Sequence, residues 1–443
     1  MTRHTKPKFR MNFLALTSLL AVTALSCGTS SAPTQQAVAY PTAPVHLTMW
    51  GTGEPQETNL LKGTIIPAYQ KLHPNVTIDL QSFPTAVLDT KLYVSIGNGT
   101  AADLMSINGT SLPIMYPRNV LAPAEDQNFT GGVQSLIDSY LPGSLSALMY
   151  KGKLYGLPRV MYGYALAENN RAFAAAGLDP IKDAPKTWDD LVRISKLLTK
   201  TDANGHLIQK GFDFRFTAGP HWLTDFFVLY EYQNGGKIFD GSGKPIFNDA
   251  NGVKAMELVQ KVSSSYPLVS HNSSGSPYQD FATEQDAMAL GGPNMGAFVE
   301  SLNPKMVGNY TFVPEPQINP ALPVNFKLNF NFVVNAKSSP EVKRVAWDFI
   351  GYALNDASRW FQVIKNLTPK KGWYTQSPSK DTPGMDVFIH ELSIARPAPA
   401  TEFYAQFQQI MADAIQKVVQ NHAPIQATLD AAVAQYNQAL AGP

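Results

Sequence analysis

Apolar and polar residues alternate in short segments along the first part of the chain, and a stretch with helical spacing follows each segment. Residues 46–50 and 76–80 place apolar side chains at alternate positions, which predicts two β-strands, and residues 103–107 are a third short strand-like segment. Residues 57–72 and 85–96 repeat apolar side chains every three or four positions, which predicts two helices. Strands alternating with helices of this length predict a parallel sheet with helices on its faces.

The loops that follow these strands are the first candidates for a binding site. In open parallel sheets, ligands bind beyond the carboxyl ends of the strands. The first such loop offers Trp50 and Glu54, and the third offers Ser106 and Asn108. Each loop has a purely structural alternative, with Trp50 as a core residue, Glu54 as a solvated acid, and Asn108 with Gly109 as a simple turn.

Patterns in the rest of the chain predict further strands and helices. A capping box of Thr187 and Asp190 marks the start of one helix. The expected strands are the hairpin-like segment 150–158 and residues 160–167, 245–247, 287–293, 310–314 and 330–335. The expected helices are residues 170–176, 187–198, 223–230, 248–263, 340–354 and the long segment 401–440.

The chain begins with the pattern of a secretory signal. Several basic residues precede the apolar run Met11–Leu25, which is too short to span a bilayer. Cys27 follows directly, in a sequence similar to the bacterial lipobox, so we expect residues 1–26 to be removed and Cys27 to be lipidated. Ordinary cleavage that leaves a free thiol is the alternative. The uncharged residues 28–44 are expected to be a tether.

Composition excludes several classes of protein. The 443 residues carry a formal net charge of +1, which gives no basic field for nucleic acid. A single cysteine excludes an intramolecular disulfide framework and a cysteine-based zinc site. Eight histidines show no metal-ligand spacing, and His390-Glu391 lacks the second histidine of a zincin because position 394 is Ile394. We expect no metal, no cofactor and no catalytic activity.

Seven short motifs occur in an order that resembles one known family. They are Leu72–Val76, Ala102–Met105, Lys153–Pro158 with Asn169, Pro185–Leu191, Asn234–Gly236, Ala287–Pro293 and Pro340–Ile350. Together they resemble the family 1 extracellular solute-binding proteins of ABC importers, the relatives of maltose-binding protein. The resemblance covers nearly all of residues 45–372. Two positions depart from it: Glu168 replaces a common tyrosine, and Asn294 stands where relatives often stack a tryptophan on the ligand.

The resemblance implies an α/β fold of the type II periplasmic-binding-protein class. Two discontinuous lobes would be joined by a hinge that the chain crosses three times, near residues 158–164, 310–314 and 366–371. Lobe one would take residues 45–160 and 313–366, and lobe two residues 161–312 and 367–443.

The resemblance also implies a function. The protein would be a monomeric, lipid-anchored receptor outside the cytoplasm, which captures a carbohydrate or polyol between its lobes and delivers it to a membrane permease. Two alternatives remain open. One is a secreted hydrolase that uses two cleft carboxylates, and the other is a receptor for an anion or a metal chelate.

Sugar receptors combine aromatic rings that stack on the ligand with side chains that hydrogen-bond its hydroxyls. Tyr162 and Tyr164 lie at the first expected crossing, where packing of the hinge is the alternative. Asp225, one turn after Trp222, has two readings, a hydrogen-bond partner of sugar hydroxyls or a surface acid, and we expect the surface acid. In the segment Phe330–Phe332, either Asn331 or the two phenylalanines face the ligand. The further candidates are Trp222, Asn294, Asn331 and Trp373.

Overall fold

The computed structural model describes residues 40–52, 55–83, 85–214, 220–264, 276–399, 401 and 403–441. All of them belong to one of the two units into which the chain divides, Val38–Pro443. Cys27 and Glu54 lie outside the described residues, and so does the side chain of Tyr162.

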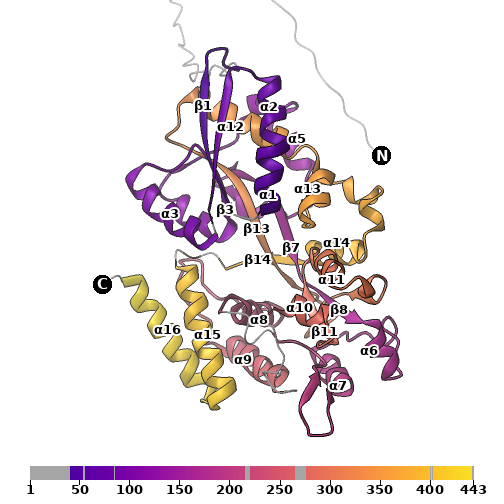
Figure 1. Ribbon diagram of the computed structural model, residues 1–443. Coiled ribbons are helices and arrows are strands. Elements are labelled where there is room, and N and C mark those ends of the chain that lie inside the picture. The colour runs from indigo at the N-terminus through magenta and orange to yellow at the C-terminus, as the bar shows by residue number, and fades with distance from the viewer. Residues whose placement is uncertain are drawn as a thin grey trace, which may run out of the picture. The chain divides into compact units, whose positions relative to one another are not determined.

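One half of this unit is built on a seven-stranded sheet (Figure 1). Its strand order is β14-β13-β3-β1-β2, and β4 and β7 also pair with β13. β1 is parallel to β2 and β3, as the alternating pattern predicts, whereas β13 is antiparallel to β3, β4 and β7. The strands are β1 (Val45–Thr52), β2 (Val76–Phe83), β3 (Leu104–Asn108), β4 (Leu121–Ala122), β7 (Gly156–Gly163), β13 (Asn325–Asn335) and β14 (Ala395–Pro397).

Helices from two separate stretches of the chain, residues 55–138 and 340–364, cover this sheet. The predicted helix over residues 57–72 forms with a π-helical turn, Leu61–Ile65, between α1 and α2. The helices are α1 (Pro55–Leu60), α2 (Ile66–Leu72), α3 (Thr85–Asn98), α4 (Leu112–Met115), α5 (Gly132–Asp138), α12 (Pro340–Ala353) and α13 (Ala357–Ile364). Their apolar faces share one core with the strands, in which Leu47, Val333 and Trp347 are buried.

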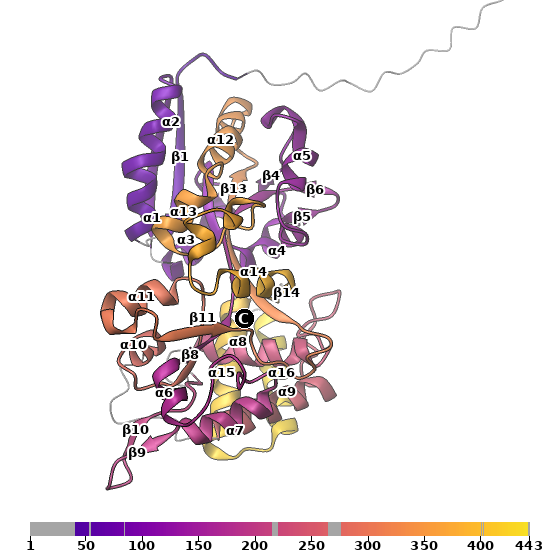
Figure 2. The same cartoon turned by 90° about the vertical axis from the view of Figure 1, so that its right-hand side faces the viewer.

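A smaller sheet of three antiparallel strands, in the order β11-β8-β12, has a separate core on each face. On one face, α15 packs against α8 and α9, and α16 packs against α9 and α15 (Figure 2). On the other, α10 packs against α11 and β11, and α14 contacts β8. These strands and helices are β8 (Ala165–Asn169), β11 (Met288–Gly291), β12 (Tyr310–Val313), α6 (Asn170–Ala175), α7 (Trp188–Leu198), α8 (Pro220–Gln233), α9 (Ala250–Ser263), α10 (Pro277–Ala282), α11 (Met295–Leu302), α14 (Met385–Ser393), α15 (Tyr404–Asn421) and α16 (Ile425–Ala441).

Two short ribbons complete the strands of the described residues. They are the hairpin of β5 (Met149–Tyr150) and β6 (Lys153–Leu154), and the pair of β9 (Lys200–Thr201) and β10 (Leu207–Gln209). None of the helices that the structure describes is both long and apolar enough to cross a membrane.

Several predicted elements form as expected and three differ. The Thr187–Asp190 capping box is confirmed at the start of α7. The predicted strand 160–167 is two strands, because it ends at Gly163 and resumes in the other sheet. The predicted helix 401–440 is also two, since His422 is left-handed and Pro424 has no N–H to continue the helix. Residues 245–247 form only an isolated bridge.

The amide of Asn325 ties together three segments where the chain passes between the sheets. Its Nδ2 donates to the carbonyl oxygen of Tyr164, at 2.8 Å, and to the carboxylate of Glu391 in α14. Its Oδ1 accepts from the N–H of Phe326. All of these groups are buried, so this amide is a fixed point of the passage between the sheets.

Candidate functional site

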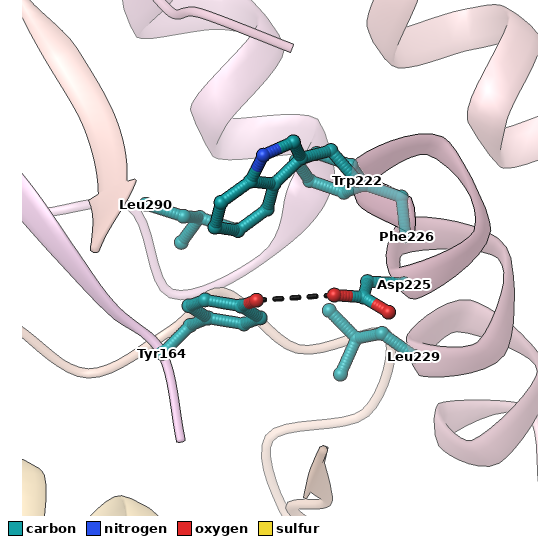
Figure 3. A pocket seen from close by; sticks show the side chains of 6 residues that line it. All are labelled: Tyr164, Trp222, Asp225, Phe226, Leu229 and Leu290. Atoms are coloured by element: carbon teal, nitrogen blue, oxygen red, sulfur yellow. Dashed lines mark hydrogen bonds between the residues drawn. The ribbon is translucent and has the colours of Figure 1, made fainter. Parts of the chain in front are cut away.

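A small pocket lies between α8 and the start of β8 (Figure 3). α8 contributes a single face to it, because Trp222, Asp225, Phe226 and Leu229 follow one another at spacings of three, one and three residues. Leu290 of β11 and Tyr164, which joins β7 to β8, close the other side. The cavity measures about 10 Å³, room for about one water molecule.

Two aromatic rings and a carboxylate meet in this pocket. The ring centres of Tyr164 and Trp222 are 5.7 Å apart with the planes inclined by 48°. The hydroxyl of Tyr164 donates to Oδ2 of Asp225 at 3.1 Å, a bond that Figure 3 shows below the indole ring. Tyr164 and Asp225 are buried, whereas Trp222 is half-buried. The expectation that Asp225 is a surface acid is therefore wrong, because its face of α8 is turned into the pocket.

Trp50, near the end of β1, packs against Phe83 and Lys91. Phe83 meets its ring edge-on at 6.0 Å, and Nζ of Lys91 lies 4.5 Å from its ring centre. Only 7% of the residue is exposed. A cation over an indole ring is a favourable contact, so one face of Trp50 is already covered.

A buried ion pair lies beside the loops after β1 and β3. Nη1 of Arg159, in β7, is 2.5 Å from Oε2 of Glu57, in α1. Nε of Arg159 donates to Oγ of the buried Ser106 at 3.3 Å. The guanidinium also lies 5.5 Å from the ring centre of Phe330 and 5.9 Å from that of Trp360. Sequence reasoning missed this pair, although a charged residue inside an apolar strand is a signal of one.

The asparagines of β3 and β13 make local hydrogen bonds. Oδ1 of Asn108 accepts from the N–H of Thr110 and caps a short turn. Nδ2 of Asn329 donates to Oδ1 of the fully buried Asn331 at 2.7 Å. Asn329 also approaches Gly109 so closely that a Cβ there would lie 2.2 Å from Oδ1 of Asn329. The glycine directly after β3 is therefore required by packing.

The remaining candidates lie in different surroundings. Asn294 is half-buried at the start of α11. Nε1 of Trp373 donates to the carbonyl of Thr368 at 2.9 Å, and its ring lies 5.2 Å from that of Phe361 in a core cluster. Phe332 is fully buried in the core, whereas Phe330 is half-buried. The backbone of Tyr162 pairs with Leu328. Among the candidates whose side chains the structure describes, Tyr164 and Trp222 lie in one pocket.

The described residues do not meet the requirements of a metal site. Within the ranges that the structure describes, no three histidine, cysteine or acidic residues come together as metal ligands would. The groups that the pocket offers are three aromatic rings, a carboxylate and two leucine side chains. Such a set can cover an apolar surface of a ligand and accept a hydrogen bond from a hydroxyl group.

A family model described as bacterial extracellular solute-binding protein matches residues 54–360. Two curated proteins match shorter stretches. A probable amino-acid ABC transporter periplasmic-binding protein, y4oP of Sinorhizobium fredii, is 35% identical over 159 residues, 34% of each chain. A putative binding protein of Brucella abortus is 27% identical over 197 residues, 44% of each chain. The chain thus aligns with less than half the length of these relatives.

Solved structures match almost the whole chain. The sugar-binding protein MalE of Xanthomonas citri has 18% identity and a TM-score of 0.72, over 90% of this chain and all of that one. A solute-binding protein of Thermotoga lettingae bound to α-D-tagatose has 22% identity and a TM-score of 0.72, over 89% and 99%. The GacH receptor of Streptomyces glaucescens has 19% and 0.71, over 90% and 98%. These likenesses confirm the predicted type II fold.

Proposed function

Because the chain belongs to the bacterial extracellular solute-binding proteins, we propose that it is the substrate-binding component of an ABC importer and takes a carbohydrate as its ligand. It works outside the cytoplasm, as members of this family do, and passes the sugar to a membrane permease. It captures the ligand as a monomer and does not convert it.

The observation that carries the choice of ligand is the meeting of Tyr164, Trp222 and Asp225 at one pocket. Its cavity of about 10 Å³ is too small to enclose a sugar, so the ligand would lie against the half-buried ring of Trp222. A sugar presents faces of C–H bonds, which aromatic rings cover, and hydroxyl groups, which donate to a carboxylate. Asp225 is the one carboxylate among the described lining residues, and a glycosidase needs a pair. The hydrolase alternative therefore has no support here.

We infer two lobes with the boundaries that the sequence suggests, residues 45–160 with 313–366 and residues 161–312 with 367–443. The separate sheets and cores support this division. Three strands extend beyond it, since β7 continues to Gly163, β12 ends at Val313, and β14 joins the larger sheet. Ligand contacts made to both lobes would favour a closed state over an open one.

The ligand class is tested by titration calorimetry against monosaccharides, oligosaccharides, polyols and amino acids. We expect saturable one-to-one binding of a carbohydrate and no heat with amino acids. Amino acids are included because one relative carries that description. Binding of an amino acid in place of every sugar would overturn the proposed ligand.

Replacement of Trp222 by alanine is expected to weaken binding of that sugar tenfold to a hundredfold. Loss of a stacked ring removes apolar contact area worth about 1 to 3 kcal/mol. Phe298 is a matched control, because it is an exposed ring of α11 outside the pocket. Phe298→Ala should bind as the parent protein does. Equal affinities of the Trp222→Ala and parent proteins would remove the pocket from the binding site.

Membrane attachment is expected to depend on Cys27. A diacyl or triacyl anchor on this residue buries many methylene groups at about 0.8 kcal/mol each, enough to hold the protein at a bilayer. Cys27→Ser should move the protein from the membrane fraction to the soluble fraction without changing its affinity for the sugar. A variant that still sediments with salt-washed membranes would contradict lipidation.

A further inference from the structure

A groove runs between α14 and the segment that begins with β12. Its volume is about 740 Å³, within the usual range of small-molecule sites. α14 turns one face towards it through Val387 and Glu391, and its flanking residues Gly384 and Ile394 continue this spacing of three or four positions. The opposite wall is Tyr310–Glu315. None of its lining residues belongs to the pocket of Tyr164 and Trp222.

The lining of this groove combines apolar walls with buried acids. Val313, Ile394 and several prolines supply apolar surface. Glu315 and Glu391 are 2% and 0% exposed, respectively. The other charged lining residues are exposed, and they are Lys186, Asp386 and His390. The two buried ionisable residues of the groove other than Tyr310 are therefore both acids.

One carboxylate oxygen of Glu391 accepts no hydrogen bond from the described residues. Its Oε2 accepts from Nδ2 of Asn325, whereas Oε1 has no partner among the described residues. Burial raises the pKa of this carboxyl to about 7, although hydrogen bonds from Asn325 and the Glu315 backbone lower it. A buried carboxylate oxygen without a donor is costly, and a positively charged donor would satisfy it.

We propose that the groove is a second binding site, for a small organic cation that carries a primary ammonium or guanidinium group on an apolar body. The cationic group would donate to Oε1 of Glu391, and the apolar body would cover Val313 and Ile394. A neutral molecule of the same shape cannot supply the charge, and an anion would be repelled by Glu315 and Glu391. The site is independent of the sugar pocket, so its test needs no sugar.

The probe is 2-phenylethylammonium, with 2-phenylethanol as the neutral isostere, in titrations followed by NMR and calorimetry. We expect saturable binding of the cation and none of the alcohol. Glu391→Gln should weaken binding at least tenfold, because the amide keeps the shape and removes the charge. Asp386→Asn is the matched control on the exposed rim of the same helix, and it should change affinity by less than about twofold, as surface ion pairs do.

Binding should also depend on pH with a defined sign. The groups around Glu391 are Asn325 of β13, Glu315 beyond β12, Asp386 and His390 of α14, and Lys186 across the groove. The cation requires the ionised carboxylate, while a primary amine stays protonated up to a pH of about 10. Affinity at pH 5.5 should therefore be at least tenfold weaker than at pH 8 in the parent protein, and Glu391→Gln should not show this loss.

Val387→Trp provides a second variant that fills the groove without touching an acid, and it should also abolish binding. It decides the matter if Glu391→Gln does not fold. The proposal is overturned if the cation binds Glu391→Gln or Val387→Trp as well as the parent protein, if the alcohol binds equally, or if Asp386→Asn loses as much affinity as Glu391→Gln.

Discussion

Replacement of Arg159 by methionine is expected to lower the free energy of unfolding by about 3 to 5 kcal/mol. Methionine fills most of the space but leaves the Glu57 carboxylate, 2% exposed, without the guanidinium that now lies 2.5 Å away. The hydrogen bond to Ser106 is lost as well. Guanidinium chloride unfolding of the variant and the parent protein at pH 7 measures the difference.

Two further variants separate charge from packing. The double variant Arg159→Met with Glu57→Gln removes both charges and should recover at least half of the lost stability. Arg193→Met breaks an ion pair with Asp190 whose arginine side chain is 61% exposed, and it should cost less than about 1 kcal/mol. A double variant as unstable as Arg159→Met would show that lost packing, rather than the buried charge, is responsible.

Replacement of Glu168 by glutamine is expected to stabilise the protein increasingly as the pH rises. Glu168 is fully buried in β8, and neither carboxylate oxygen has a hydrogen-bond partner among the described residues. Burial raises its pKa from 4.5 to about 9. Between these values the folded protein holds one proton more than the unfolded chain, so each pH unit costs about 1.4 kcal/mol of stability.

The measurement is the stability of Glu168→Gln relative to the parent protein at pH 5 and at pH 7. The difference should grow by about 3 kcal/mol between the two, because the amide does not titrate. Glu168→Leu should behave in the same way, which excludes an effect peculiar to the amide. If either variant retains the pH dependence of the parent protein, another group is responsible for it.

Local sequence patterns predicted many of the helices and strands, but they did not predict which distant strands pair. The start of α7 was predictable because Thr187 and Asp190 satisfy each other's backbone within four residues. The break before α16 was missed because apolar periodicity continues on both sides of it, although Pro424 was a signal. The two-sheet topology came from a family resemblance, since strand alternation does not specify which distant strands pair.

The site was less predictable, because its contacts depend on tertiary packing. Tyr164 and Trp222 were candidates by residue type, but nothing local placed their rings together. Asp225 was expected on the surface but is buried. The helix α8 is apolar over most of its circumference, so the sequence does not indicate which side of it faces the protein interior. Arg159 is conspicuous inside a strand, yet its partner Glu57 lies in a helix far away along the chain.

The position of β13 has a consequence for the order of folding during synthesis. This strand lies between β3 and β14 and also pairs with β4 and β7, but it ends at Asn335, long after β3 ends at Asn108. At a translation rate of 5 to 20 residues per second, the emerging chain lacks the centre of its larger sheet for roughly 10 to 45 s. Machinery that exports unfolded chains would therefore act on a chain in which the core of the larger sheet has not yet formed.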